Sequence, residues 1–194
     1  MFTLKTAERF EQEIKKSRFL ASAGPVGSEE DARRFITACS SLEAGHNCWA
    51  FRIGGIYRFN DDGEPGGTAG RPILQAIDGQ DLDRVAVVVS RWFGGVLLGA
   101  GGLMRAYGGT AAACLRSAER QPIIAYVSLS VTCRFADEAR IRTGLATYPD
   151  ALVETGGFTA EGVRLQVKLP SNRTDDFIRM VTDISRGQAE VETL

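Results

Sequence analysis

The chain has 194 residues, of which 44% are hydrophobic, so its length and composition suit one large or two small globular domains. Lysines and arginines total 23 against 24 acidic residues. This balance excludes a general electrostatic attraction to nucleic acid, so any such binding must come from a local patch.

The cysteines and the hydropathy pattern indicate the cellular location. The four cysteines form no CxxC pair, which argues against a zinc ribbon and against a disulfide framework. The first 16 residues carry charges throughout, and no apolar run of about 18 residues occurs. We therefore expect a cytoplasmic protein without membrane contact.

The first elements in chain order are a strand and a helix. Residues Glu13–Ala23 alternate in polarity and predict a strand that Pro25 ends. Ser28 then begins the sequence SEED, a start typical of a capping box, and apolar residues follow at helical spacing as far as Cys39.

A β-hairpin is predicted next. The strand His46–Ile53 splits by parity, and the side with Trp49 and Phe51 is expected to face the core. Two glycines then turn the chain into a second strand over Ile56–Phe59.

These strands predict a basic strand face. If they share one sheet with the first strand, four cations gather on its uncovered side: Lys16, Arg18, Arg52 and Arg58. The alternative is a solvated outer face whose arginines keep the sheet soluble.

The segment Asn60–Arg71 has too many turn formers for regular structure. Its carboxylates, Asp61, Asp62 and Glu64, are oxygen ligands of the kind that Mg²⁺ prefers, although their spacing lacks the complete calcium-loop pattern. The alternative is that Asp62 and Thr68 cap local turns while Arg71 opens a short helix.

A buried strand over Val85–Ser90, a glycine-rich loop and a helix over Leu103–Ala118 follow. The N–H groups at the helix start predict a site for a phosphate or carboxylate, built by Gly94, Gly95, Gly99, Gly101 and Gly102 and flanked by Arg91 and Arg105. The loop matches neither GxGxxG nor GxxxxGK[ST]. The alternative is that the glycines only allow a tight connection between strand and helix.

The segment Glu119–Pro122 predicts a domain boundary that divides the chain into residues 1–121 and 122–194, because a proline ends the preceding helix. The patterns after it follow the order strand, helix, strand, strand, helix, strand, with strands over Val127–Phe135, Ala151–Thr155, Val163–Leu169 and Ala189–Leu194. This βαββαβ order is the ferredoxin-like arrangement, an antiparallel sheet with both helices on one face.

Four separated motifs resemble those of the IMPACT/YigZ family. They are EIKKSRF at residues 13–19, HNCWAFRI at 46–53, DDGEPGGTAGRPIL at 61–74 and RWFGGVLLGAGGLMRAYGG at 91–109. Their order is that of the family, and the βαββαβ tail is similar to the second domain of its bacterial members. Two positions depart from the family pattern: Gly66 stands where a serine is usual, and Leu97 where a lysine is common.

The resemblance implies an α+β chain of two domains. The amino-terminal one is expected to be an α/β sandwich similar to the second domain of ribosomal protein S5, and the ferredoxin-like carboxy-terminal one to be similar to the last domain of elongation factor G. Eukaryotic members of the family regulate translation by competing for an activator of a stress-responsive initiation-factor kinase.

The function predicted from these observations is that of a non-enzymatic regulator acting on translation. Its partner is expected to be the ribosome, RNA or a translation-associated protein, contacted by the DDGEP loop with His46 and Thr68, by the glycine loop and by the basic strand face. Phosphate contacts are expected from Lys16, Arg18, Arg71, Arg91 and Arg105. This interpretation requires the acidic and glycine-rich loops to come together in space.

Two enzymatic alternatives remain open at this point. In one, Asp61, Asp62 and Glu64 hold Mg²⁺ while the glycine loop holds the phosphate of a phosphorylated or nucleotide substrate. In the other, Cys48 is a nucleophile with His46 as its base, against the reading of a buried cysteine beside a structural histidine.

Overall fold

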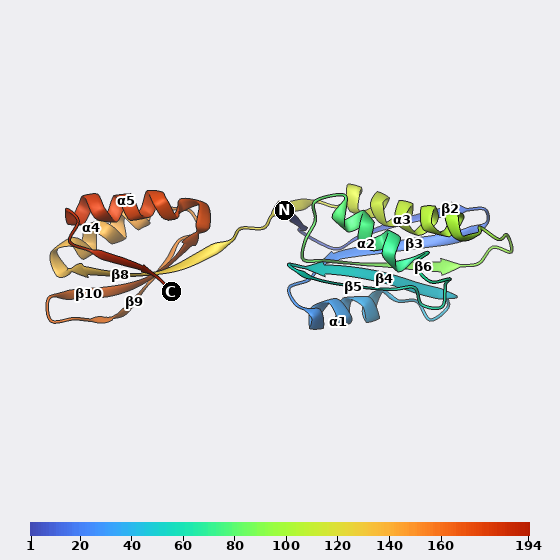
Figure 1. Cartoon of the computed structure of the whole chain (residues 1–194), viewed down its shortest axis with the longest axis horizontal. Coiled ribbons are helices and arrows are strands. Elements are labelled where there is room, and N and C mark those ends of the chain that lie inside the picture. The colour runs from blue at the N-terminus through green and yellow to red at the C-terminus, as the bar shows by residue number, and fades with distance from the viewer. The chain divides into compact units, whose positions relative to one another are not determined.

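The computed structural model describes residues 1–194, which divide into two compact units, Met1–Ile123 and Ile124–Leu194. Each unit has its own sheet and its own hydrophobic core (Figure 1), which confirms the predicted α+β class with two domains. The boundary predicted between residues 121 and 122 falls within β7, Arg120–Pro122. This strand pairs with β1, Phe2–Leu4, so it belongs to the first unit.

The first unit is built on a five-stranded antiparallel sheet in the order β2-β3-β6-β4-β5. Its strands are β2 Glu8–Ile14, β3 Ser17–Pro25, β4 His46–Ile53, β5 Ile56–Asn60 and β6 Val85–Trp92. Its helices are α1 Glu29–Cys39, α2 Gly70–Asp78 and α3 Ala100–Ser117. Helices α2 and α3 cover one face of the sheet and α1 covers the other (Figure 1).

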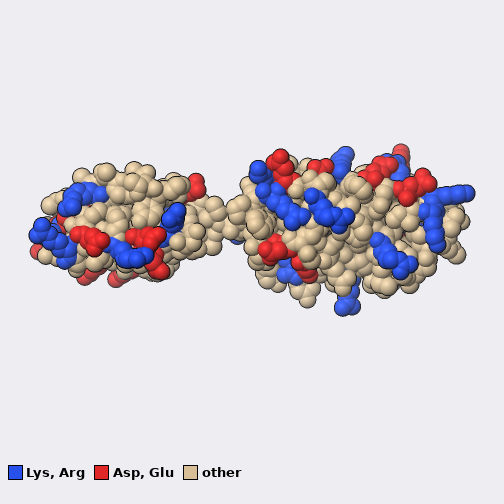
Figure 2. Space-filling view, turned by 90° about the horizontal axis from the view of Figure 1, so that it is seen from above, with Lys and Arg blue, Asp and Glu red and all other residues tan.

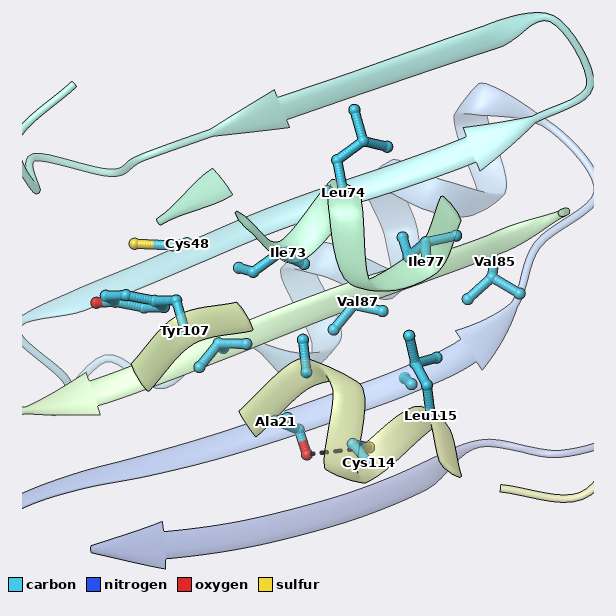
Figure 3. Packing of buried hydrophobic residues seen from close by; sticks show 14 of the residues in the cluster. Ala21, Cys48, Ile73, Leu74, Ile77, Val85, Val87, Tyr107, Cys114 and Leu115 are labelled. Carbon is cyan, nitrogen blue, oxygen red and sulfur yellow. Dashed lines mark hydrogen bonds between the residues drawn. The ribbon is translucent and has the colours of Figure 1, made fainter. Parts of the chain in front are cut away.

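Strand β6 is the middle strand of this sheet and is buried from Val85 to Arg91, as the β-branched run predicted. Its inward side chains meet α2 and α3 in the main core (Figure 3), where Val87 lies near Ile73 of α2 and Leu115 of α3. Strand β6 pairs antiparallel with β3 on one side and with β4 on the other, and its last residues lead into the loop that precedes α3.

The prediction that the aromatic side of β4 faces the main core was wrong. Cys48 and Ala50 point into the main core, whereas Trp49 and Phe51 pack with α1 in a smaller cluster. Both faces of β4 are covered by helices, so both parities are apolar and parity alone does not identify the larger core.

The predicted basic strand face is not formed, because its four cations lie in different places. Lys16 sits in the β2–β3 turn, where φ is +66°, because the expected single strand is in fact a hairpin. Arg52 and Arg58 lie on opposite faces of the sheet and bind Asp78 and Glu29 respectively. Arg18 binds Glu11 across the hairpin.

The second unit has the predicted βαββαβ order and is ferredoxin-like. Its elements are β8 Tyr126–Arg134, α4 Phe135–Leu145, β9 Leu152–Phe158, β10 Gly162–Pro170, α5 Thr174–Ser185 and β11 Glu190–Thr193, with a short 3₁₀ turn, η1 Ser171–Arg173, before α5. The sheet is antiparallel, in the order β11-β8-β10-β9, and both helices lie on one face (Figure 1). Strand β9 is longer than predicted because it continues through Gly156 and Gly157 beside a register shift.

The likeness to ribosomal protein S5 and to elongation factor G stays a prediction.

Across both units, none of the helices combines the length and the apolar character that crossing a bilayer requires.

Gly94, just after β6, is required by close packing. A Cβ at this position would lie 1.8 Å from the carbonyl oxygen of Lys16. We predict that Gly94→Ala destabilises the first unit by about 3 kcal/mol, because backbone on both sides must shift. Gly109→Ala is the matched control, since a Cβ there meets nothing within 4 Å and should stabilise α3 by about 0.5–1 kcal/mol.

The measurement is urea unfolding followed by tryptophan fluorescence. Both tryptophans, Trp49 and Trp92, belong to the first unit, so the signal reports that unit alone. Equal midpoints for Gly94→Ala and the native chain would contradict the packing argument.

Candidate functional site

The acidic loop, residues 61–69, connects β5 to α2 and is organised by Asp61. The carboxylate of Asp61 accepts hydrogen bonds from the backbone N–H groups of Gly67, Ala69 and Gly70 at 2.8–3.0 Å. The last two N–H groups open α2, whose N-cap residue, Ala69, offers no side-chain bond of its own. The chain thus supplies its own anion to this helix start.

These bonds shift the ionisation of Asp61. Burial by itself raises the pKa of the carboxyl group, but the three N–H donors outweigh that effect and hold the pKa below its ordinary value of 3.8. The charged form of Asp61 is therefore the form that stabilises the loop.

Glu64 ties the acidic loop to the rest of the unit. Its Oε1 accepts from Arg91 Nη1 at 2.6 Å and from Tyr107 Oη at 2.7 Å. The Glu64 and Arg91 side chains are only 4% and 7% exposed. Because Arg91 ends the buried part of β6 and Tyr107 lies on α3, this ion pair joins three segments that are distant in sequence.

His46 fixes the outer part of the same loop. Its Nδ1 lies 2.7 Å from the carbonyl oxygen of Asp62, which can only accept, so Nδ1 carries the proton. The carboxylate of Asp62 accepts from the Asn47 backbone N–H at 2.5 Å, and Asp62 itself has a φ of +43°. His46 Nε2 faces Glu64 Oε1 at 3.9 Å.

The glycine loop, residues 93–99, leaves the end of β6 and enters α3. Ser17 anchors its start, because Ser17 Oγ accepts from the Gly94 N–H at 3.2 Å and lies 3.5 Å from Arg91 Nη2. Gly95 and Gly99 have φ values of +83° and +71°, a region that other residues rarely adopt. Gly101 and Gly102, predicted as loop residues, instead form the first turn of α3.

Apolar side chains of the glycine loop point outward. Three of them are exposed, namely Phe93 (58%), Val96 (38%) and Leu97 (84%), and Met104 (44%), one turn into α3, is exposed as well. We call these four residues the glycine-loop patch. The Phe93 ring also lies 5.5 Å from the buried guanidinium of Arg91, which ties the patch to the ion pair.

Glu64 of the acidic loop contacts Arg91, which lies in β6 two residues before the glycine loop begins, so the acidic loop packs against the end of the strand from which the glycine loop starts; direct contact between the two loops stays a prediction. The cations around them differ in availability. Lys16, Arg71 and Arg105 are exposed and have no carboxylate within 4 Å, so they remain available to a ligand. Arg91 is buried against Glu64, so its position does not support the predicted role as a phosphate ligand.

The residues present do not fit a magnesium ion. Asp61, Asp62 and Glu64 each bind a different set of partners within the chain, and no group of three His, Cys, Asp or Glu residues converges on one point. The carboxylates predicted as metal ligands are therefore structural.

Thiol catalysis does not fit either. Cys48 is fully buried and its Sγ donates to the carbonyl oxygen of Asp61 at 3.0 Å. Burial raises the pKa of this thiol to about 12, so it stays protonated and is a poor nucleophile. Thr68 is likewise buried, and its hydroxyl donates to the carbonyl of Pro65 as a local turn cap.

Sequence reasoning missed Tyr107, Ser17 and the outward apolar residues. Tyr107 lies on the buried side of α3, but nothing in helical periodicity shows that its hydroxyl meets a carboxylate 43 residues earlier. The exposed run Val96-Leu97 did carry a signal, because two adjacent apolar residues in a glycine-rich loop need a partner or a cover.

We predict that Asp61→Asn lowers the stability of the first unit by about 2 kcal/mol at pH 7, because a charged acceptor of three hydrogen bonds is lost. Since the folded-state pKa of Asp61 is lowered, its contribution is complete above about pH 3.8 and disappears as the pH falls through the folded value. The difference between variant and native chain should therefore shrink below pH 4. Urea unfolding across pH measures it, with the exposed Glu13→Gln as control; a difference independent of pH would contradict the assignment.

We predict that Glu64→Gln destabilises the first unit by about 3 kcal/mol, because it leaves the Arg91 charge buried without a counter-charge. Tyr107→Phe should lower stability by only about 1 kcal/mol. In a double-mutant cycle, Glu64→Gln with Arg91→Met should be less destabilising than the sum of the single changes. Strictly additive effects would contradict the coupling.

Comparison with known proteins places these features in a family. The family described as Impact N-terminal domain matches residues 15–115, and that described as Domain of unknown function (DUF1949) matches residues 131–188. The "IMPACT family member in pol 5'region" of Thermus thermophilus is 45% identical over 180 residues, which cover 92% of this chain and 99% of that protein. The "Protein IMPACT homolog" of Dictyostelium discoideum is 37% identical over 94 residues, 44% of this chain and 27% of that protein.

A solved structure shares the fold. A crystal structure described as that of an hypothetical protein is 30% identical, has a TM-score of 0.72, and the match covers 100% of this chain and 96% of that one. The first family match contains the acidic loop, β6 and the glycine loop, so the candidate site lies within the matched segment. Because its sequence matches along nearly the whole length, the chain belongs to the IMPACT family.

Proposed function

We propose that this protein is a non-enzymatic regulator that acts on translation by contacting the ribosome, its RNA or a translation-associated protein through the acidic and glycine loops. The observation that carries the proposal is the buried bond between Glu64 and Arg91. It fixes the acidic loop against the end of β6, from which the glycine loop starts, and so supports a surface that both loops share. Membership of the IMPACT family supports a role in translation, because the resemblance implies that function for eukaryotic members.

The use of the polar side chains supports binding over catalysis. The carboxylates of the acidic loop stabilise backbone and Arg91, and the thiol of Cys48 is buried and protonated. What remains exposed around the loops are apolar side chains and three cations without carboxylate partners: Lys16, Arg71 and Arg105. These groups suit recognition of a surface rather than turnover of a small substrate.

The test is co-sedimentation of the full chain with purified bacterial ribosomes over a salt series from about 50 to 500 mM. We expect binding at low salt that weakens as salt rises. Lys16→Glu and Arg105→Glu should each weaken binding and flatten the salt dependence, because each removes a cation from the contact.

Arg140→Glu is the matched control, an exposed cation of the second unit that also lacks a carboxylate partner. It should behave like the native chain. No sedimentation of the native chain at low salt would overturn the proposal.

A further inference from the structure

We propose that the glycine-loop patch docks an acidic amphipathic segment of a protein partner. This inference rests on the proposed function and deepens it, because it names the class of partner. The occupant is a helix or strand that presents apolar side chains to Phe93, Val96, Leu97 and Met104 and carboxylates to the cations beside them.

The apolar part of the patch is too exposed for a structural role. Leu97 is 84% exposed and Phe93 58%, and they stand in one loop with Val96. Single exposed apolar residues are normal on protein surfaces. Several of them in one short loop are typical of a site at which another molecule binds. Leu98, the one apolar loop residue outside the patch, packs on the core instead.

The loop that carries the patch is held in place from both ends. Gly94 fits against the β2–β3 turn with no room for a Cβ, and its N–H donates to Ser17. At the other end, Gly99 starts α3, and the first turn packs back on Leu98, since a Cβ at Gly102 would lie 3.0 Å from the Leu98 Cβ. A surface already in its bound shape loses little conformational freedom when a partner binds.

The chain segment that carries the patch is basic. No Asp or Glu occurs between Asp83 and Glu119, a stretch that contains β6, the glycine loop and all of α3. Lys16 lies beside the patch, because its carbonyl oxygen packs against Gly94. Arg105 follows Met104 in α3, and its Nη1 lies 3.6 Å from the position that a Cβ at Gly101 would take. Neither cation has a carboxylate partner within the chain, so the complementary partner is acidic.

A protein segment fits this surface better than RNA does. Only Phe93 of the four patch residues offers an aromatic face on which a base can stack. Val96, Leu97 and Met104 have aliphatic or thioether side chains, which pack against other apolar side chains. Figure 2 shows both signs of charge spread over the α2 and α3 side of the first unit, rather than a continuous basic stripe that a phosphate backbone would follow.

The test uses three synthetic helical peptides. One carries leucines at positions i, i+3, i+4 and i+7 with glutamates elsewhere, the second replaces the glutamates by lysines, and the third replaces the leucines by serines. We expect the acidic amphipathic peptide to bind the full chain saturably in fluorescence anisotropy. The other two should bind at least roughly tenfold more weakly, because each lacks one of the two complementary features.

Variants of the chain locate the contact. Leu97→Ser and Arg105→Glu should each lower the affinity for the acidic peptide roughly five- to tenfold. Phe158→Ser is the control, because Phe158 is a 75% exposed apolar residue of the second unit. All of the changes are on exposed side chains, so the thermal unfolding midpoints should stay as in the native chain.

Each outcome decides between the proposals. The inference is overturned if the acidic peptide binds Leu97→Ser as tightly as it binds the native chain. It is also overturned if the acidic peptide does not bind, whereas labelled polyuridine RNA binds the native chain and fails to bind Leu97→Ser. Ribosome sedimentation that Leu97→Ser leaves unchanged also overturns it but keeps the proposed function. Peptide binding at the patch without any ribosome sedimentation keeps the inference and removes the proposed function.

Discussion

The first unit depends on one buried ion pair, that between Glu64 and Arg91. Taking both charges out of water is unfavourable. Tyr107 offsets part of this cost with a hydrogen bond to the same carboxylate, and the guanidinium lies 5.6 Å from the ring centre of Phe19 and 5.5 Å from that of Phe93. One N–H of the guanidinium, at Nε, remains without a partner. A contact with this balance adds little net stability, but it permits only one position of the acidic loop relative to β6 and α3.

That constraint explains why polar residues typical of an active site serve here as structure. Asp61 neutralises the start of α2, Asp62 closes the turn over His46, and Glu64 neutralises Arg91. A metal or a nucleotide would have to displace these bonds one by one. The same bonds hold the backbone of the acidic loop in one arrangement, and a surface that is already formed loses little conformational freedom when it binds.

The outward chemistry around the glycine loop is mixed. The glycine loop exposes apolar side chains, and Lys16 and Arg105 near it have no carboxylate partner, whereas the α2 and α3 side of the unit carries both signs of charge (Figure 2). A partner that matches only the apolar residues would meet unpaired cations, and one that matches only the cations would leave Leu97 and Phe93 in water. In the proposed docking, specificity comes from requiring both features at once.

The sequence by itself determined most of the elements, the two-domain α+β class, the βαββαβ order and the family, because these follow from local periodicity, turn residues and contiguous motifs. It also placed β6 as a central strand. Only the tertiary structure decided which face of β4 holds the main core, that Lys15 and Lys16 turn a hairpin in left-handed conformation, and that Arg91 is internal. The reason is that a contact such as that of Glu64 with Tyr107 joins residues far apart in the chain. A local sequence pattern does not indicate which distant residue a buried charge contacts.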